Sequence, residues 1–323
     1  MDADVIGQTA GEFELPLPFG GAGKVREWYR LPGAKRLIVT TDRISAFDSV
    51  VARVPRKGQV LNQLSAFWFE RTRDIIPNHL VAAIDPLASV VIEAEAFPVE
   101  VIVRGRITGV TSTALWRRYE LGERDIYGYE FPEGLRKNDA LGAPIVTPTT
   151  KGGPTGHDER LTCAEVVSGG WLDETTWERV MTAALALFER GRSIARKAGL
   201  ELVDTKYEFG RSPDGEVLLI DEMHTPDSSR FWKMSTMEER MARGEEPEAM
   251  DKEFVRLAFA RLGYRGDGPI PSLPAEVWEE TGALYRGVYE ALTGKPFVPV
   301  ADPGPGKGAT ERMMDALSRG GYL

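Results

Sequence analysis

Charged residues that a buried strand rarely has lie within or next to two apolar runs in the middle of the chain. Run 202–210 contains three of them, and run 218–220 is followed by two. These charged residues are Asp204, Lys206, Glu208, Asp221 and Glu222. Ser212-Pro213-Asp214-Gly215 lies between the runs and predicts the turn of a β-hairpin. Moving a charge out of water is unfavourable unless the charge is paired or binds a metal. We therefore expect the hairpin to bind an ion and a phosphate.

The faces of this hairpin depend on its register. Side chains alternate along a strand, so Asp204, Lys206 and Glu208 share one face. Asp221 shares that face only if the numbers of paired residues add to an odd value, and we predict such a register. Glu208 and Asp221 could then hold one Mg²⁺ with nucleotide phosphates, because a few oxygen ligands favour that ion.

A glycine-rich segment near the N-terminus, 20–26, is a second candidate for phosphate binding. Glycines let backbone N–H groups approach a phosphate, and Lys24 and Arg26 supply positive charge. The segment is not a P-loop, because Pro18 and Val25 stand where that motif needs Gly and Ser or Thr. The alternative interpretation is a plain turn before a strand.

Two arginine-containing segments could bind an anionic substrate. Arg104 follows an apolar run and is separated from Arg106 by one glycine, which suits bidentate contact with a phosphate or carboxylate. Solvated arginines at a strand end fit the same spacing. The second segment places Asp227, Ser229 and Arg230 directly after a proline, and such a density of polar groups beside carboxylates is typical of a binding site.

Two further polar segments read as loops. Segment 41–48 contains Ser45 and Asp48, which could donate or accept hydrogen bonds with a substrate. Segment 147–159 contains Lys151, which could contact phosphate, and His157, which could be a general base or a capping group. The spacing of the three histidines does not match a zinc site.

Short β-branched runs and periodic apolar stripes locate the elements that must position these residues. Strands are predicted at 36–41 and 99–103, and helices at 60–71, from Asp173 to Gly199, at 252–262 and at 274–292. Segment 119–148 is rich in Gly, Pro and charged residues, which predicts a long irregular insertion or a connection between domains. Strands followed by helices and a hairpin favour an α+β fold over an alternating parallel sheet.

Composition restricts the possible partners. The net charge of −9 over 323 residues argues against sequence-independent nucleic-acid binding. We see no secretory signal and no apolar run of membrane-spanning length, so no membrane partner is expected. The single cysteine, Cys163, excludes an internal disulfide and favours the cytoplasm. Oligomeric state is left open.

Eight ordered motifs resemble the SAICAR synthetase (phosphoribosylaminoimidazole-succinocarboxamide synthase) family. The most specific is Asp204-Thr205-Lys206-Tyr207-Glu208-Phe209-Gly210. The others lie at 23–26, 41–48, 57–58, 64–68, 98–104, 147–151 and 225–232. The resemblance implies an α+β, two-lobed fold with ATP between an antiparallel N-terminal β lobe and a larger α+β lobe. We place the nucleotide-covering lobe at 1–97 and the lobe with the substrate sites at 98–323.

The resemblance also implies an activity. The family is an ATP- and Mg²⁺-dependent ligase of de novo purine biosynthesis. It condenses carboxyaminoimidazole ribotide (CAIR) with L-aspartate to give SAICAR, ADP and phosphate. An acyl phosphate is the chemically reasonable intermediate, because a carboxylate has no good leaving group until it is phosphorylated.

Carried over residue by residue, the resemblance gives four groups. ATP would contact Gly23, Lys24, Arg26, Glu100, Lys151 and Lys206. Mg²⁺ would be held by Glu208 and Asp221, and CAIR by Ser45, Arg104, Asp227, Ser229 and Arg230. Catalytic roles fall to Lys151, Asp204 and Lys206, with Asp204 considered as a base for the amine.

One departure from the family is visible, because Val110 stands where many members have a CAIR-binding serine. Thr111, Ser112 or Thr113 could supply that hydroxyl. Two other classes of function share parts of this pattern. A kinase-like phosphotransferase acting on a small alcohol would need no aspartate, and a non-catalytic nucleotide-binding module would not need Lys206, Glu208 and Asp221 together.

Overall fold

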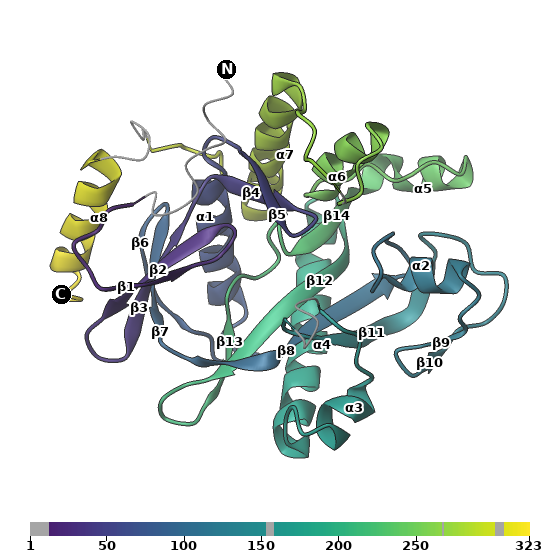
Figure 1. Ribbon diagram of the computed structural model, residues 1–323, viewed down its shortest axis with the longest axis horizontal. Helices are drawn as coiled ribbons and strands as arrows, with labels where there is room; N and C mark the ends of the chain where they lie inside the picture. The colour runs from purple at the N-terminus through teal and green to yellow at the C-terminus, as the bar shows by residue number, and fades with distance from the viewer. Residues whose placement is uncertain (1–12, 153–157, 267, 301–306) are drawn as a thin grey trace.

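The computed structural model describes residues 13–152, 158–266, 268–300 and 307–323. Its first sheet is antiparallel, with the strand order β1-β2-β3-β7-β6 (Figure 1). The bounds are β1 (Phe19–Ala22), β2 (Arg26–Leu31), β3 (Lys35–Thr40), β6 (Leu80–Asp85) and β7 (Ala88–Ile92). Strand β3 confirms the strand predicted at 36–41, and its buried Leu37 and Val39 show the expected alternation.

The segment predicted as a polar loop at 41–48 is instead mostly strand. β4 (Arg43–Ala46) pairs with β5 (Ser49–Arg53) through a two-residue turn, whose Phe47 and Asp48 both have positive φ. Its polar side chains are satisfied internally, which is why polarity misled the prediction. Arg43 is buried against Glu27 at 3.3 Å, and Asp42 accepts hydrogen bonds from the Arg56 and Gly58 amides.

The second sheet carries most of the candidate residues. Its order is β11-β8-β12-β13, with β14 also paired to β12. The bounds are β8 (Glu95–Arg106), β11 (Ala140–Thr150), β12 (Leu200–Arg211), β13 (Val217–Ile220) and β14 (Ser229–Lys233). All these strand pairs are antiparallel, as expected for an α+β fold. The loops predicted at 119–148 and 147–159 are therefore wrong in part, since β11 covers residues 140–150. Arg104 and Arg106 lie within β8 and do not follow its end. Pro148 is tolerated because β11 is an edge strand.

The hairpin itself is confirmed, but its predicted register is wrong. Glu208 pairs with Ile220 and Phe209 with Leu219, which gives an even sum. The reason is a three-residue loop at 213–215, closed by the Gly215 amide on the Ser212 carbonyl, with φ of 86° at Gly215. Glycine takes such a left-handed φ without strain, and this loop length shifts the pairing by one residue relative to a two-residue turn.

Helices cover the sheets. α1 (Lys57–Arg71) contacts β3, β6 and α7 (Ala275–Thr293), while α4 (Glu174–Lys197) lies against β8, β11 and β12 (Figure 1). Asp173 caps α4 as predicted, accepting a hydrogen bond from the Thr176 amide at 2.9 Å. The remaining elements are α2 (Leu115–Glu120), β9 (Asp125–Ile126), β10 (Tyr129–Glu130), α3 (Cys163–Ser168), α5 (Met234–Ala242), α6 (Glu253–Arg261) and α8 (Lys307–Arg319).

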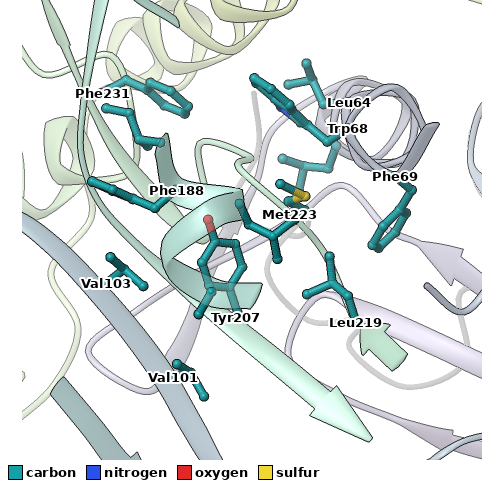
Figure 2. Packing of buried hydrophobic residues seen from close by; sticks show 14 of the residues in the cluster. Leu64, Trp68, Phe69, Val101, Val103, Phe188, Tyr207, Leu219, Met223 and Phe231 are labelled. Carbon is teal, nitrogen blue, oxygen red and sulfur yellow. The ribbon is translucent and has the colours of Figure 1, made fainter. Parts of the chain in front are cut away.

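The main core lies between the second sheet and the helices α1 and α4. Figure 2 shows Tyr207 of β12 among Phe188 of α4, Trp68 of α1 and Met223, which follows β13. Tyr207 is fully buried, so its strand neighbours Lys206 and Glu208 must project from the opposite face of the sheet. Burial of one face thus fixes the direction of the charged residues.

The C-terminal segment returns to the first sheet. The helix α8 was not among the predicted helices, and its Ala309, Met313 and Leu317 join a core cluster with Leu37 and Val39 of β3. The lobe boundary at residue 97 stays a prediction, and α8 packs against the sheet of the N-terminal lobe although it lies far beyond that boundary. None of the described helices is long and apolar enough to cross a membrane.

Candidate active site

A cavity of about 350 Å³ lies between the β1–β2 and β4–β5 turns and the open face of the second sheet. Nine of the fourteen residues given a role by the resemblance line it: Lys24, Ser45, Glu100, Arg104, Asp204, Lys206, Asp227, Ser229 and Arg230. Asp48, a further candidate, lines it as well. Thr111, one of the possible substitutes for the missing family serine, lines it as well. Strand pairing and the fold thus bring together side chains that lie more than 200 positions apart.

The other five candidates lie beside the cavity. Lys151 and Glu208 join the ion pairs of Lys206, and Arg26 and Asp221 form a neighbouring pair. Gly23 donates its amide to the Arg26 carbonyl at 2.7 Å and so closes the β1–β2 turn.

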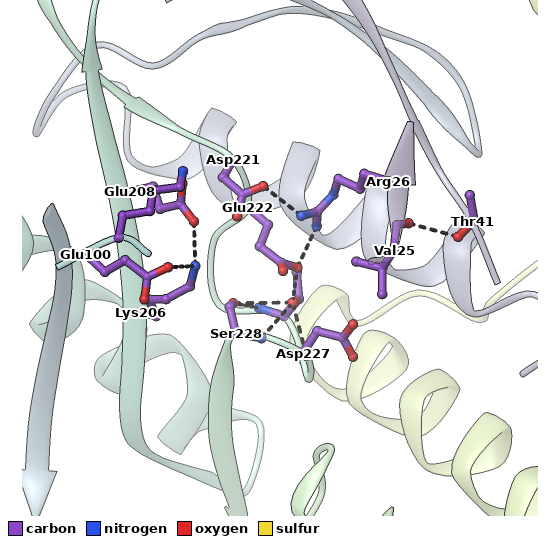
Figure 3. A network of polar contacts seen from close by, with 12 residues as sticks. Val25, Arg26, Thr41, Glu100, Lys206, Glu208, Asp221, Glu222, Asp227 and Ser228 are labelled. Carbon is purple, nitrogen blue, oxygen red and sulfur yellow. Dashed lines mark hydrogen bonds and ion pairs between the residues drawn. The ribbon is translucent and has the colours of Figure 1, made fainter. Parts of the chain in front are cut away.

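The centre of the site is a chain of alternating charges from β8, β12 and the residue that follows β11. Figure 3 shows Glu100 of β8 with Lys206 and Glu208 of β12. Lys206 Nζ lies 2.8 Å from Glu100 Oε1 and 2.5 Å from Glu208 Oε1, and Lys151 binds the second oxygen of Glu208. Burial opposes the charge on Glu208, but Lys206 and Lys151 outweigh it and lower the pKa of this carboxyl to about 2. The pKa of Lys206 rises despite burial, because Glu208 and Glu100 stabilise its charge.

A second cluster joins β2 to the end of the hairpin. The Arg26 guanidinium lies 2.7 Å from Asp221 Oδ1 and 2.8 Å from Glu222 Oε2, as Figure 3 shows. Burial raises the pKa of Asp221, and the nearby charge of Glu208 raises it further, while Arg26 opposes both. Lys24 does not join this cluster, because it lies in the turn and pairs with Asp48 at 2.5 Å.

Glu208 and Asp221 nevertheless act on each other. Their positions have opposite parity, but the chain leaves the strand at Asp221, where φ is 65°, and the charge of Glu208 raises the pKa of Asp221. Among the described residues no group of three or more His, Cys, Asp and Glu side chains could hold a metal. Two carboxylates are what Mg²⁺ needs when substrate phosphates and water complete its shell. The residues present therefore fit that ion.

Arg104 and Arg230 in the cavity wall are both held by one carboxylate, that of Asp204. Asp204 Oδ2 lies 2.5 Å from Arg230 Nη1 and 3.5 Å from Arg104 Nη1, and Arg104 Nε also donates to Thr147 Oγ1 at 2.8 Å. Burial alone would lower the pKa of Arg230, but Asp204 and Glu253 raise it above its usual value. Two permanently charged guanidinium groups thus face the cavity together.

Asp227 is also fixed, by partners that the sequence did not suggest. Lys57 Nζ lies 2.7 Å from Asp227 Oδ2, and the Tyr285 hydroxyl donates to Oδ1 at 2.6 Å. Burial opposes its charge, but Lys57 and Lys252 hold the pKa of Asp227 well below its usual range. Its neighbour Ser229 is 2.7 Å from the Thr205 hydroxyl. Both oxygens of Asp227 are therefore engaged before any substrate binds.

The sequence analysis missed three residues that line the cavity from the start of α6: Asp251, Lys252 and Arg256. Arg256 lies 3.0 Å from Glu253 Oε2, which is itself 3.8 Å from Arg230 Nη2. The spacing of Lys252 and Arg256, four residues apart at a predicted helix start, was the available signal. That helix was predicted without any role in the site.

Neither of the two histidines in the described part of the chain, His79 and His224, lines the cavity. His79 and His224 are buried, and burial lowers the pKa of each to about 3. His224 bonds to the Tyr207 hydroxyl at 2.5 Å, within the core. His157, a candidate base or capping group, lies outside the described residues. Cys163 is half-buried at the start of α3 and is a free cysteine.

The similarities of this chain to known proteins extend over most of its length. A family model described as SAICAR synthetase matches residues 21–269. The phosphoribosylaminoimidazole-succinocarboxamide synthase of Legionella pneumophila (strain Paris) is 47% identical over 309 residues, which are 95% of this chain and 97% of that protein.

Solved structures agree in fold. SAICAR-synthase from Saccharomyces cerevisiae complexed with SAICAR is similar with a TM-score of 0.74 and 32% identity, covering 91% of this chain and 100% of the yeast chain. A SAICAR synthetase (Type-2) in complex with ADP has a TM-score of 0.66 and 24% identity, covering 86% of this chain and 99% of that one, and supports the fold.

Proposed function

The chain belongs to the SAICAR synthetase family, and from that premise we propose how its cavity residues divide the family's reaction. The enzyme is an ATP-dependent ligase that condenses CAIR with L-aspartate to give SAICAR, ADP and phosphate in purine biosynthesis. One observation carries the assignment of the site. A single cavity brings together Lys24 of the glycine-rich turn, Lys206 beside Glu100, and the guanidinium groups of Arg104 and Arg230, with Lys151 and Glu208 next to it.

The nucleotide binds at the end of the cavity near the β1–β2 turn. Gly23 and Lys24 lie in that turn, and Lys151 and Lys206 approach from the second sheet. Their ammonium groups exchange a carboxylate partner for phosphate oxygens, which carry more charge. Glu100 keeps Lys206 in place at 2.8 Å, so we assign it a positioning role at the nucleotide site.

Glu208 and Asp221 would hold Mg²⁺ together with the nucleotide phosphates. Mutual repulsion of the two carboxylates supports this role, because a divalent cation bound there would relieve it. When bound, the ion neutralises charge on the transferring phosphoryl group. Arg26, which lies on Asp221 and Glu222, then becomes available for a phosphate oxygen.

CAIR binds at the other end of the cavity. Arg104 and Arg230 grip its phosphate, since guanidinium groups suit bidentate contacts with phosphate oxygens. Asp204 holds both guanidinium groups, which favours a positioning role for it over its use as a base. Ser45, Asp227 and Ser229 line the remaining wall; the hydroxyls bond the substrate, and Asp227 shapes the loop that orients the ring.

The chemistry proceeds in two displacements. A CAIR carboxylate oxygen attacks the γ-phosphorus, the bond to ADP breaks, and an acyl phosphate forms. The aspartate amine then attacks the acyl carbon, phosphate leaves, and the amine loses its proton. Lys151 and Lys206 neutralise the charge of the phosphoryl group as it moves, which is the main requirement of such a transfer.

Incubation of the protein with ATP, Mg²⁺, CAIR and L-aspartate tests the proposal directly. We expect SAICAR and ADP in equal amounts, with both absent when aspartate or CAIR is omitted. Formation of ADP with a phosphorylated alcohol and no aspartate requirement would instead identify a kinase-like phosphotransferase.

A further inference from the structure

The ammonium group of Lys252 differs from the other cations of the cavity. The cations that line it are Lys24, Arg104, Lys206, Arg230, Lys252 and Arg256. Five of them form an ion pair with a carboxylate in the part of the chain that the structure describes. Lys252 has no such partner among the described residues. Lys252 is half-buried, and an ammonium that is partly removed from water without a partner is costly, so its position at a cavity wall points to a ligand.

The backbone fixes Lys252 at the wall. Its amide donates to the Pro226 carbonyl at 3.0 Å, which ties the start of α6 to the loop that carries Asp227. The preceding carboxylate, Asp251, accepts from the Phe231 amide at 2.8 Å and so anchors the same turn to β14. Lys252 is therefore held between the substrate loop and α6, and its position does not depend on its own side-chain contacts.

The charges that face Lys252 do not balance its own. Burial is the largest influence, Asp227 and Glu222 favour the charge, and Arg256 and Lys57 oppose it; together they lower the pKa of Lys252 to about 8. Asp227 is the nearest source of negative charge, but Lys57 already neutralises it at 2.7 Å. The site therefore lacks about one negative charge.

We propose that Lys252 binds an oxyanion of the non-nucleotide substrates, either the phosphate or carboxylate of CAIR or a carboxylate of L-aspartate. The inference rests on the proposed function of the cavity and adds a substrate-binding residue to it. Contact with an anion completes the charge balance and stabilises the protonated form of the lysine. Binding is accordingly coupled to proton uptake above pH 8, where the free enzyme holds Lys252 partly neutral.

Steady-state kinetics of Lys252→Met and Lys252→Arg test this inference. For Lys252→Met we expect the KM for CAIR or for L-aspartate to rise at least about tenfold, as for loss of one charged hydrogen bond, with the KM for ATP within about twofold. The substrate whose KM rises identifies the oxyanion. We expect the KM of the wild type to rise above pH 8. Lys252→Arg should restore most of the affinity and remove this rise, because arginine stays charged.

Lys233→Met is the matched control, because Lys233 is exposed and pairs with Glu248 outside the cavity. Thermal melting of each variant separates loss of binding from loss of folding. Unchanged KM values for CAIR and L-aspartate in folded Lys252→Met would overturn the inference. A fall in kcat alone that Lys252→Arg does not repair would also overturn it, because it indicates proton transfer. The proposed function fails separately, if the wild type makes no SAICAR.

Discussion

The carboxylate of Asp221 lies near enough to that of Glu208 for the two charges to repel, although the strand register assigns the two residues to opposite faces. Glu208 pairs with Ile220, and the chain leaves the ladder at Asp221, where φ is 65°. A non-glycine residue adopts this conformation only at an energetic cost, and such residues concentrate at functional sites. The two carboxylates are therefore held together by a strained turn that the sheet alone would not produce.

Replacement of Glu208 by Gln should abolish turnover and leave the fold intact. The change keeps the size of the side chain but removes the charge that Lys151 and Lys206 face. We expect kcat to fall at least about a hundredfold, more than for loss of a residue that only supports a metal ligand. SAICAR formation at saturating Mg²⁺ measures the effect. Glu216→Gln in the exposed hairpin turn is the control, and wild-type activity of Glu208→Gln would exclude the metal role.

Arg230→Ala should mainly weaken CAIR binding. It removes one of the two guanidinium groups that Asp204 holds and leaves this carboxylate with only Arg104 at 3.5 Å. A charged hydrogen bond contributes about 1.5–3 kcal/mol, so the KM for CAIR should rise about tenfold to a hundredfold. The KM for ATP should change little. Arg243→Ala, in an exposed ion pair with Glu239, is the control; an unchanged KM for CAIR would reject the role of Arg230.

The C-terminal helix should contribute measurably to stability. Leu317 of α8 is fully buried in the cluster that covers the first sheet, whereas Leu323 is 54% exposed. Leu317→Ala should lower the free energy of unfolding by about 2–5 kcal/mol, and Leu323→Ala by less than about 0.5 kcal/mol. Denaturant titration of both variants makes the comparison. Equal effects of the two substitutions would mean that α8 does not stabilise the sheet.

The sequence correctly predicted those features of the fold that depend only on residues close together in the chain. The caps of α4, the stripe of α1 and the hairpin turn follow from short-range rules, and the structure has them. The register of the hairpin failed because it depends on whether the loop has two or three residues, and Pro213-Asp214-Gly215 is compatible with both. Strand β4 was missed because Arg43 is buried by an ion pair with Glu27, a partner 16 residues away.

Site residues were predictable where a motif carried several polar groups together. Asp204, Lys206 and Arg230 line the cavity as the motifs suggested. Lys252 and Lys57 were missed, because their importance comes from tertiary neighbours that no spacing encodes. Lys57 in particular lies 170 positions from the carboxylate it neutralises.

The buried pair of Lys57 and Asp227 makes a prediction about stability. The two side chains lie 2.7 Å apart, are 0% and 2% exposed, and link α1 to the substrate loop. Lys57→Met removes the cation and leaves an uncompensated carboxylate, so the free energy of unfolding at pH 7 should fall by about 3–5 kcal/mol. The double variant with Asp227→Asn should recover part of this loss. A Lys57→Met protein as stable as the wild type would show that the pair contributes nothing to folding.

Acid titration of stability separates this pair from other carboxylates. In the folded protein the pKa of Asp227 lies well below its usual range, so the pair stabilises the fold at pH values above about 4. That contribution is lost as the pH falls below about 4 toward the lowered folded pKa. In Lys57→Met the same carboxyl is buried without its cation, which raises its pKa and makes protonation favour the fold. The stability difference between wild type and Lys57→Met should therefore shrink as the pH falls from 7 to 4, which urea unfolding at fixed pH measures; a constant difference would assign the effect of the variant to packing.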